Sequence, residues 1–254
     1  MMKKLIVVFG NFDINNRLGG QTVRTNTVYE SIKKHYLEYN IIKLDTACNN
    51  KIILLIKTLF FFCICKRIII LPAQKSLFPI LKIIHSLKLE KKVIYVVIGG
   101  WLFDYIKDNQ NYINILKKLK AILVQVDKLK QNLINLNLKN VDILLNYRSV
   151  HFDMIEYKEK VNKIVFYSRI FKEKGIEIAV EAVKNINLDI ELDIYGPINA
   201  DYESSFFEII NNEKRIHYCG VLNGFETIIS TLSQYRFMIF PTYYEGEGFP
   251  RSSS

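Results

Sequence analysis

The chain has 254 residues, half of them hydrophobic, and a net charge of +10 from 35 basic and 25 acidic residues. This length and hydrophobic content suffice for a large buried core or for two ordinary domains, which excludes an intrinsically disordered protein. The positive charge predicts an anionic partner, such as nucleic acid, an acidic membrane surface or a phosphate-bearing substrate.

Short apolar runs alternate with amphipathic stretches along the first part of the chain, which is typical of parallel strands covered by helices. Strands are predicted at residues 4–9, 40–44, 67–71, 92–98, 121–125 and 142–145. Helices are predicted at residues 22–36, 76–87, 111–119 and 128–137. We therefore expect an α/β domain over residues 1–147.

Two apolar segments raise the question of a membrane. The opening stretch MMKKLIVVFGNFD has too short an apolar run for a signal peptide, so we expect it to form the first strand. Residues 52–65 are the most apolar segment, yet they contain a lysine and are shorter than the roughly 20 residues that a membrane span needs. We expect a core helix there, with shallow docking on a membrane surface as the alternative.

The apolar pattern stops after Asn146 and resumes at Lys163, so residues 148–162 are predicted to be a linker. Residues 163–254 form a second predicted domain, with strands at 163–167, 191–195, 215–218 and 236–240 and helices at 176–185, 202–211 and 225–234. The expected fold class is α/β with two doubly wound, Rossmann-like domains. In such domains, loops and helix N-termini at the carboxyl ends of the strands can hold a phosphate.

Two loops at these predicted edges have residues suited to an anion. Gly19 and Gly20 precede the first helix, where adjacent glycines let backbone amides come close to an anion, although alone they indicate only a helix-entry turn. Arg169 and Lys174 precede the helix at 176–185 and could together neutralise a diphosphate. A solvated basic loop is the alternative interpretation of that pair.

Two further loops follow strands of the second domain. Gly196 and Pro197 follow the strand at 191–195 and alone indicate an ordinary turn. Carboxylates accept hydrogen bonds from sugar hydroxyls, and glycines expose backbone N–H groups to phosphate oxygens, so an acidic, glycine-containing loop could bind a sugar phosphate. The loop at residues 241–250 carries such candidates: Glu245, Glu247, Gly248 and Phe249. By itself it is an acidic turn.

Taken in order, these motifs resemble those of family 4 glycosyltransferases, particularly the enzymes of bacterial capsule and lipopolysaccharide clusters, whose two-domain fold is called GT-B. The shared order is R-x4-K-G from Arg169, a strand ending in Gly196-Pro197, the short strand His217-Tyr218-Cys219-Gly220, and P-T-x-x-E-G-x-G from Pro241. The segment Val97–Leu102 is also similar to an acceptor-domain segment of capsule enzymes.

The resemblance implies retaining transfer of a sugar from a nucleotide diphosphate sugar to a lipid-linked or saccharide acceptor. The enzyme would be cytoplasmic, with peripheral contact at the inner face of the cell membrane. Arg169 and Lys174 would bind the diphosphate, Gly19 and Gly20 would approach it from the first domain, and Glu247 would act near the transferred sugar. The other implied donor-binding residues are Gly196, Pro197, Glu245, Gly248 and Phe249.

The resemblance also implies a second acidic residue one place beyond Ser254, so we expect an incomplete second domain. A catalytically inactive remnant that binds donor phosphate weakly is therefore the alternative. A nucleic-acid binder is the third hypothesis, disfavoured because the basic residues are scattered and match no recognition module.

No cofactor and no metal are implied, because arginine and lysine would neutralise the diphosphate and no Asp-x-Asp cluster exists to hold Mg²⁺. The four cysteines lack the spacing of a zinc site and are expected to be buried thiols of a reducing cytoplasm. None of the four histidines is assigned a catalytic role.

Overall fold

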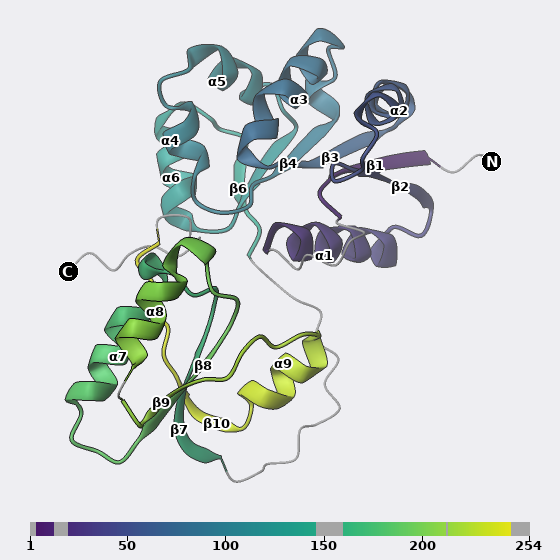
Figure 1. Ribbon diagram of the computed structural model, residues 1–254. Helices are drawn as coiled ribbons and strands as arrows, with labels where there is room; N and C mark the ends of the chain where they lie inside the picture. Colours follow the sequence, from purple (N-terminus) through teal and green to yellow (C-terminus); the bar gives the residue numbers. More distant parts are fainter. Residues whose placement is uncertain (1–3, 13–19, 146–159, 212, 245–254) are drawn as a thin grey trace. The chain divides into compact units, whose positions relative to one another are not determined.

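The computed structural model describes residues 4–12, 20–145, 160–211 and 213–244 (Figure 1). The chain divides into two compact units, the first containing strands β1–β6 and the second, within His151–Tyr244, strands β7–β10. Each unit has one parallel sheet with helices packed on it. This is the α/β class that the alternation of apolar runs predicts.

The first sheet has the strand order β2-β1-β3-β4-β5-β6. Its strands are β1 (Lys4–Gly10), β2 (Tyr39–Asp45), β3 (Arg67–Leu71), β4 (Val93–Val96), β5 (Ala121–Val124) and β6 (Val141–Ile143). All six predicted strands are confirmed. Val7 of β1 pairs with Ile42 on one side and Ile68 on the other, so the centre of the sheet is built from β-branched residues that fit a pleated, buried surface.

Helices cover both faces of this sheet. They are α1 (Gly20–His35), α2 (Lys51–Ile64), α3 (Gln74–Ser86), α4 (Leu102–Ile106), α5 (Gln110–Leu116) and α6 (Asp127–Asn135), with a 3-10 turn at Glu90–Lys92. Val28 and Tyr29 of α1 pack into one apolar cluster, whereas Phe62 of α2 and Leu81 of α3 pack into another. The sheet is therefore doubly wound, and its winding reverses where β2 and β3 flank β1.

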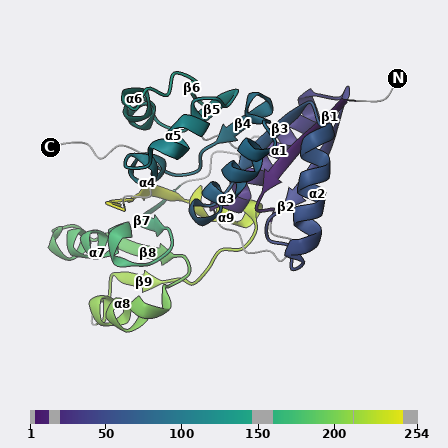
Figure 2. The same cartoon turned by 90° about the horizontal axis from the view of Figure 1, so that it is seen from above.

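Helix α2 forms where the apolar segment 52–65 predicts a helix, but the expectation of a core helix is wrong. Only Thr58 and Phe62 are buried, while Ile52, Ile56 and Phe60 are 73%, 61% and 59% exposed. The reason is position: α2 lies along β1 and β2 at one side of the unit, where one stripe of the helix finds a partner (Figure 2).

No helix among the described residues combines the length and apolar character that crossing a bilayer requires.

The second sheet has the strand order β10-β7-β8-β9. Its elements are β7 (Val161–Tyr167), a 3-10 turn (Lys172–Lys174), α7 (Ile176–Asn185), β8 (Glu191–Tyr195), a 3-10 turn (Ala200–Tyr202), α8 (Glu203–Ile210), β9 (Ile216–Tyr218), α9 (Phe225–Leu232) and β10 (Tyr235–Met238). Every strand and helix predicted for this part is confirmed. Helices α7 and α8 bury one face of the sheet around Phe166 and Phe206, and the chain then returns through α9 to the opposite edge (Figure 1).

The cysteines correct one expectation. Cys65 is buried, but Cys48 is half-buried and Cys63 and Cys219 are exposed. Cys63 lies on the uncovered side of α2 and Cys219 lies in the loop after β9, and the sequence alone does not reveal this exposure.

We expect the two faces of α2 to respond differently to truncation. Phe62 is fully buried and packs edge-on against Phe9 with ring centroids 6.0 Å apart, so Phe62→Ala should lower the free energy of unfolding of the first unit by about 3–5 kcal/mol. Phe60→Ala removes an exposed ring of the same helix and should change it by less than about 0.5 kcal/mol. Urea unfolding followed by the fluorescence of Trp101, the single tryptophan, isolates this unit. Equal losses in both variants would contradict the described burial.

Candidate functional site

The carboxyl edge of the second sheet brings together the loops that follow β7, β8 and β9. The Ser168 amide donates to the Tyr195 carbonyl at 3.2 Å, and the Ile170 amide donates to the Pro197 carbonyl at 2.9 Å. The Gly196 amide donates to the Gly220 carbonyl at 2.9 Å. Three motifs that are separate in the sequence thus form one hydrogen-bonded rim.

Gly196 is required by the close approach of two chains in this rim. Its φ is +141°, a conformation that side-chain-bearing residues rarely adopt, and an added Cβ would overlap the Ser168 carbonyl oxygen. The Tyr218 hydroxyl also donates to the Gly196 carbonyl at 3.0 Å. Packing within the unit therefore explains this glycine without any ligand.

The loop after β10 closes onto the turn that follows β7. Gly175 has φ +79°, and a Cβ there would overlap the carbonyl of Pro241. The Tyr243 amide donates to the Glu173 carbonyl at 3.0 Å, and the Thr242 hydroxyl donates to the same oxygen at 3.2 Å. Because β7 and β10 flank the point where the winding of the sheet reverses, this is where a doubly wound sheet offers a crevice to a ligand.

Lys174 lies in that turn with its side chain surrounded by aromatic rings. The residue is 7% exposed, and its Nζ lies 4.7 Å from the ring centroid of Tyr244, 5.7 Å from that of Phe171 and 5.9 Å from that of Phe240. Burial, together with the positive charge of Arg169, lowers the pKa of the Lys174 ammonium to about 8. Arg169 itself lies 5.6 Å from the Phe171 centroid.

Two cations that repel each other in a poorly hydrated setting favour a bound anion, because an anion relieves both the repulsion and the desolvation. Helix α7 begins directly after them, and its N-cap residue Gly175 contributes no capping side chain. The N-terminus of a helix attracts negative charge. This edge of the second unit is therefore suited to phosphate.

The other predicted site residues have different outcomes. Gly20 is the first residue of α1 in the first unit, and no atom of the described residues lies within 4 Å of a Cβ built on it, so packing among those residues does not require a glycine there. The remaining predicted residues lie outside the described part of the chain: Gly19, Glu245, Glu247, Gly248 and Phe249.

Two features of this unit are not predicted from the sequence. The first is the aromatic surround of Lys174, whose only sequence signal is the density of Phe and Tyr in residues 237–244. The second is a polar cluster on the sheet face opposite α7 and α8, which arises because successive residues of β8 point to opposite faces.

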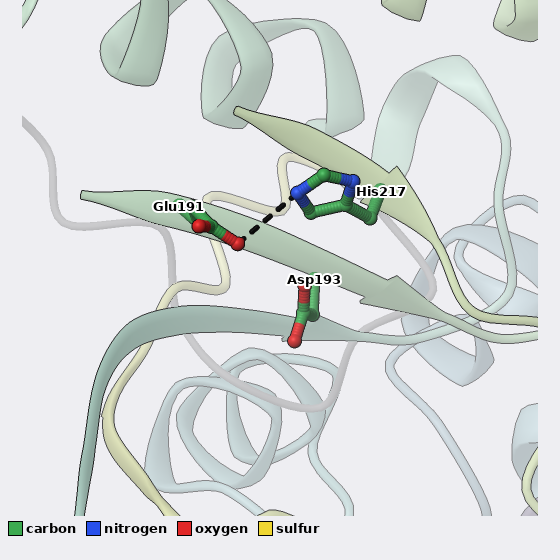
Figure 3. Close-up of side chains that lie close together, drawn as sticks. All are labelled: Glu191, Asp193 and His217. Carbon is green, nitrogen blue, oxygen red and sulfur yellow. Dashed lines mark hydrogen bonds and ion pairs between the residues drawn. The ribbon is translucent and has the colours of Figure 1, made fainter. Parts of the chain in front are cut away.

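Figure 3 shows three members of this cluster, Glu191, Asp193 and His217, whose ligand-type atoms lie within 4.8 Å of one another. A metal ion could be held by such a set. However, the Lys163 Nζ already lies 2.6 Å from Glu191 Oε2 and 3.6 Å from Asp193 Oδ1. The hydrogen bond between Lys163 and Glu191 raises the pKa of the lysine and lowers that of the glutamate, so both stay charged.

The cluster is completed by the Tyr235 hydroxyl, which donates to Asp193 Oδ2 at 2.7 Å. His217 Nε2 lies 3.1 Å from the Glu191 carboxylate. Since Lys163 supplies the positive charge that a metal would bring, this donor set fits a charge-paired network across four strands better than a metal centre.

Residues 147–252 match the family model described as glycosyl transferases group 1. An uncharacterized glycosyltransferase of Methanocaldococcus jannaschii is 25% identical over 150 residues, which cover 59% of this chain and 39% of that protein. The chain thus spans 39% of the length of this curated relative.

Solved structures support the fold. The lipopolysaccharide outer core galactosyltransferase WaaB superposes with a TM-score of 0.61 at 12% identity, covering 97% of this chain and 76% of that chain. HepE of Anabaena, solved with UDP and glucose, gives a TM-score of 0.64 at 12% identity, covering 96% and 76%. The α/β fold with parallel sheets predicted from the sequence is the fold of these GT-B glycosyltransferases.

We expect Gly196→Ala to destabilise the second unit by at least about 3 kcal/mol, because both the backbone conformation and the Ser168 carbonyl oppose a methyl group. Gly220→Ala is the matched control: its φ is also positive, at +82°, but a Cβ there meets open space, so the loss should be about 1–2 kcal/mol. Urea unfolding followed by far-UV circular dichroism measures the difference, with Trp101 fluorescence reporting that the first unit is unchanged.

The stability of the second unit should depend on pH through Lys174. The folded pKa of about 8 lies below the ordinary value of 10.5, so folding disfavours the protonated form. Stability should therefore rise as pH increases from about 8 to 10.5, by up to about 3 kcal/mol from this group. Lys174→Met should abolish the rise, and Arg169→Gln should shift its onset to higher pH. An identical pH profile in wild type and Lys174→Met would refute the buried charge.

Proposed function

We propose that this protein is a GT-B glycosyltransferase that transfers a sugar from a nucleotide diphosphate sugar to a lipid-linked or saccharide acceptor in surface polysaccharide biosynthesis. In this proposal the transfer is retaining, uses no metal, and takes place in the cytoplasm or peripherally at the inner face of the cell membrane. The proposal draws on the group 1 family match, and on two solved relatives of the same fold, one a lipopolysaccharide galactosyltransferase and the other bound to UDP and glucose.

The observation that carries the proposal is the cation pair Arg169 and Lys174 at the N-terminus of α7, beside the reversal point of the second sheet. The family match spans this pair. Both cations are positioned by the backbone contacts that Gly175 and Gly196 permit, so they are arranged before any donor binds. Preorganised charge of this kind is the largest single contribution to many enzymatic rates.

The chemistry follows from the charges. When the bond between the donor sugar and its diphosphate breaks, negative charge develops on the departing phosphate oxygen. Protonated Lys174 and Arg169 would stabilise that charge in place of a metal ion. A bound phosphate would raise the pKa of Lys174 and keep it protonated, because opposite charges favour the ionised form.

The remaining assignments follow the family resemblance. Glu247 would act near the transferred sugar, and the Gly19-Gly20 segment would approach the diphosphate. The other donor contacts are assigned to Gly196, Pro197, Glu245, Gly248 and Phe249. The rim formed by the Gly196-Pro197 loop beside Arg169 is consistent with its part of this assignment.

We expect Lys174→Met and Arg169→Ala each to weaken the binding of UDP, the probe ligand, by about 10- to 100-fold, the worth of one charge-assisted hydrogen bond. Lys172→Met is the matched control, because Lys172 belongs to the same turn but its side chain is 63% exposed; the change should stay within about twofold. The affinity of wild type should also fall above pH 8 as Lys174 loses its proton. Isothermal titration calorimetry from pH 7 to pH 10 measures all three.

Unchanged UDP affinity in both Lys174→Met and Arg169→Ala would reject the phosphate assignment. Pyrophosphate is titrated in parallel, so that a donor with another base still reveals the anion site. The release of UDP from UDP-sugars in the presence of acceptor then reports transfer, whereas the affinity for UDP reports binding alone. Normal UDP binding without UDP release would favour the alternative of a non-catalytic donor binder.

A further inference from the structure

Helix α2 has an outer face that is almost entirely apolar and exposed. The residues concerned are Ile52, Ile53, Leu55, Ile56, Leu59, Phe60 and Ile64, each between 38% and 73% exposed. Cys63, also exposed, lies among them. A helix that is apolar on all sides is normally buried on all sides. Here only the stripe containing Thr58 and Phe62 meets the first sheet.

The spacing of these residues makes the surface continuous. Ile52, Ile56, Phe60 and Cys63 follow one another at intervals of four or three residues, which places them in a row along the helix. Lys57 is the one charged residue between Ile52 and Ile64 and is exposed. An uninterrupted apolar face along a whole helix exceeds what isolated exposed side chains explain.

The stretch of sequence that contains α2 carries basic residues and no acidic ones. From Thr46 to Leu89 the sequence contains no aspartate or glutamate, but it contains seven basic residues: Lys51, Lys57, Lys66, Arg67, Lys75, Lys82 and Lys88. Six of them, all except the half-buried Arg67, are exposed. The Lys92 ammonium adds a further cation at the carboxyl end of α2, where it donates to the Cys63 carbonyl at 3.1 Å.

We infer that α2 docks on an anionic lipid bilayer, with its axis in the plane of the interface and its outer face among the acyl chains. An apolar face bordered by lysines is the pattern of helices that lie in this way, inserted by about 5–10 Å. With 14 residues α2 is about 21 Å long, long enough to lie on the bilayer and too short to cross it. Lys57 on α2 itself and Lys92 at its carboxyl end would contact lipid phosphates, each adding to the attraction.

The charge argues against the other occupants of such a face. A second copy of this chain would bring another set of seven cations against the first, and like charges at close range repel. A protein partner would need a surface that is both apolar and acidic, whereas an anionic bilayer provides both properties everywhere. This inference deepens the membrane contact of the proposed function and rests on that function for its biological setting, but the docking itself depends only on α2.

The test is co-sedimentation with vesicles of phosphatidylcholine alone and of phosphatidylcholine with phosphatidylglycerol, without any nucleotide sugar. We expect binding to the anionic vesicles that is at least about tenfold stronger than to the neutral ones. The variant Ile56→Gln/Phe60→Gln should reduce binding to the anionic vesicles by at least about tenfold, because it removes two side chains from the apolar phase.

The matched control is Leu188→Gln/Phe237→Gln, which changes two apolar residues of the second unit with similar exposures of 61% and 52% and should leave vesicle binding unchanged. A second readout uses a polarity-sensitive label on Cys63 with Cys48 and Cys219 changed to serine. Its emission should shift to the blue with anionic vesicles, whereas the same label on Cys219, with Cys48 and Cys63 changed to serine, should not shift.

Absence of binding to anionic vesicles, or equal binding to neutral ones, would overturn the inference. So would a wild-type dimer in light scattering that becomes a monomer in Ile56→Gln/Phe60→Gln, since α2 would then be a subunit interface. UDP and pyrophosphate binding by the same variant distinguish this inference from the proposed function. Both should equal those of wild type, and vesicle binding without binding of either anion would reject the function alone.

Discussion

The burial of a lysine beside an arginine is the constraint on which the candidate site depends. Lys174 can be held at 7% exposure because three aromatic rings surround its side chain with faces that attract a cation. Those rings come from two loops, so the loop after β10 must close on the turn after β7. Gly175 makes that closure possible, because any side chain there would meet Pro241. The buried charge of Lys174 thus depends on the aromatic rings around it, and the position of those rings depends on the backbone contact at Gly175.

Packing also explains why glycines stand at positions 175 and 196. A glycine in a phosphate-binding loop is usually explained by the approach of the ligand, but Gly175 and Gly196 are both required by contacts inside the unit. In the proposed site their role would therefore be indirect: they permit the backbone contacts of the loops that carry Arg169 and Lys174. Gly20, by contrast, has no packing requirement among the described residues, so its contribution must be judged on ligand binding alone.

Most of the fold could be predicted from the sequence because many strands are short apolar runs bounded by polar residues, as in β1 and β3. Helix α4 was missed, since its five residues are too few to show a period. Within the site, the pairing of Arg169 with Lys174 was readable because both lie in one loop. The contact of Lys174 with Tyr244 was not, because 70 positions separate the two residues and no local pattern encodes which loops meet.

For a related reason, the exposed side of α2 was expected only in the alternative of docking on a membrane surface, and the polar cluster on the sheet face opposite α7 and α8 was not predicted. Composition shows that a helix is apolar, but only the strand order shows that its neighbours leave most of its circumference uncovered. In the same way, Lys163, Asp193 and Tyr235 come from three strands and become partners only when the sheet forms. Sequence periodicity predicts which residues share one face of a helix or strand, but it does not predict which other element packs on that face.

Two features of this chain attract anions, and their surroundings make them differ. The lysines in the stretch that contains α2 are exposed, so at physiological ionic strength salt screens their charges beyond about 8 Å. Each therefore attracts an anionic surface only weakly, and the total attraction depends on how many there are. Lys174 is buried, so its field is screened much less and acts on one bound group at short range. High salt should therefore weaken contact with an anionic surface well before it weakens the hold on a diphosphate. In the two proposals the net charge of +10 would act in two separable ways: by general attraction of the first unit to an anionic surface, and by local recognition of a diphosphate by the second unit.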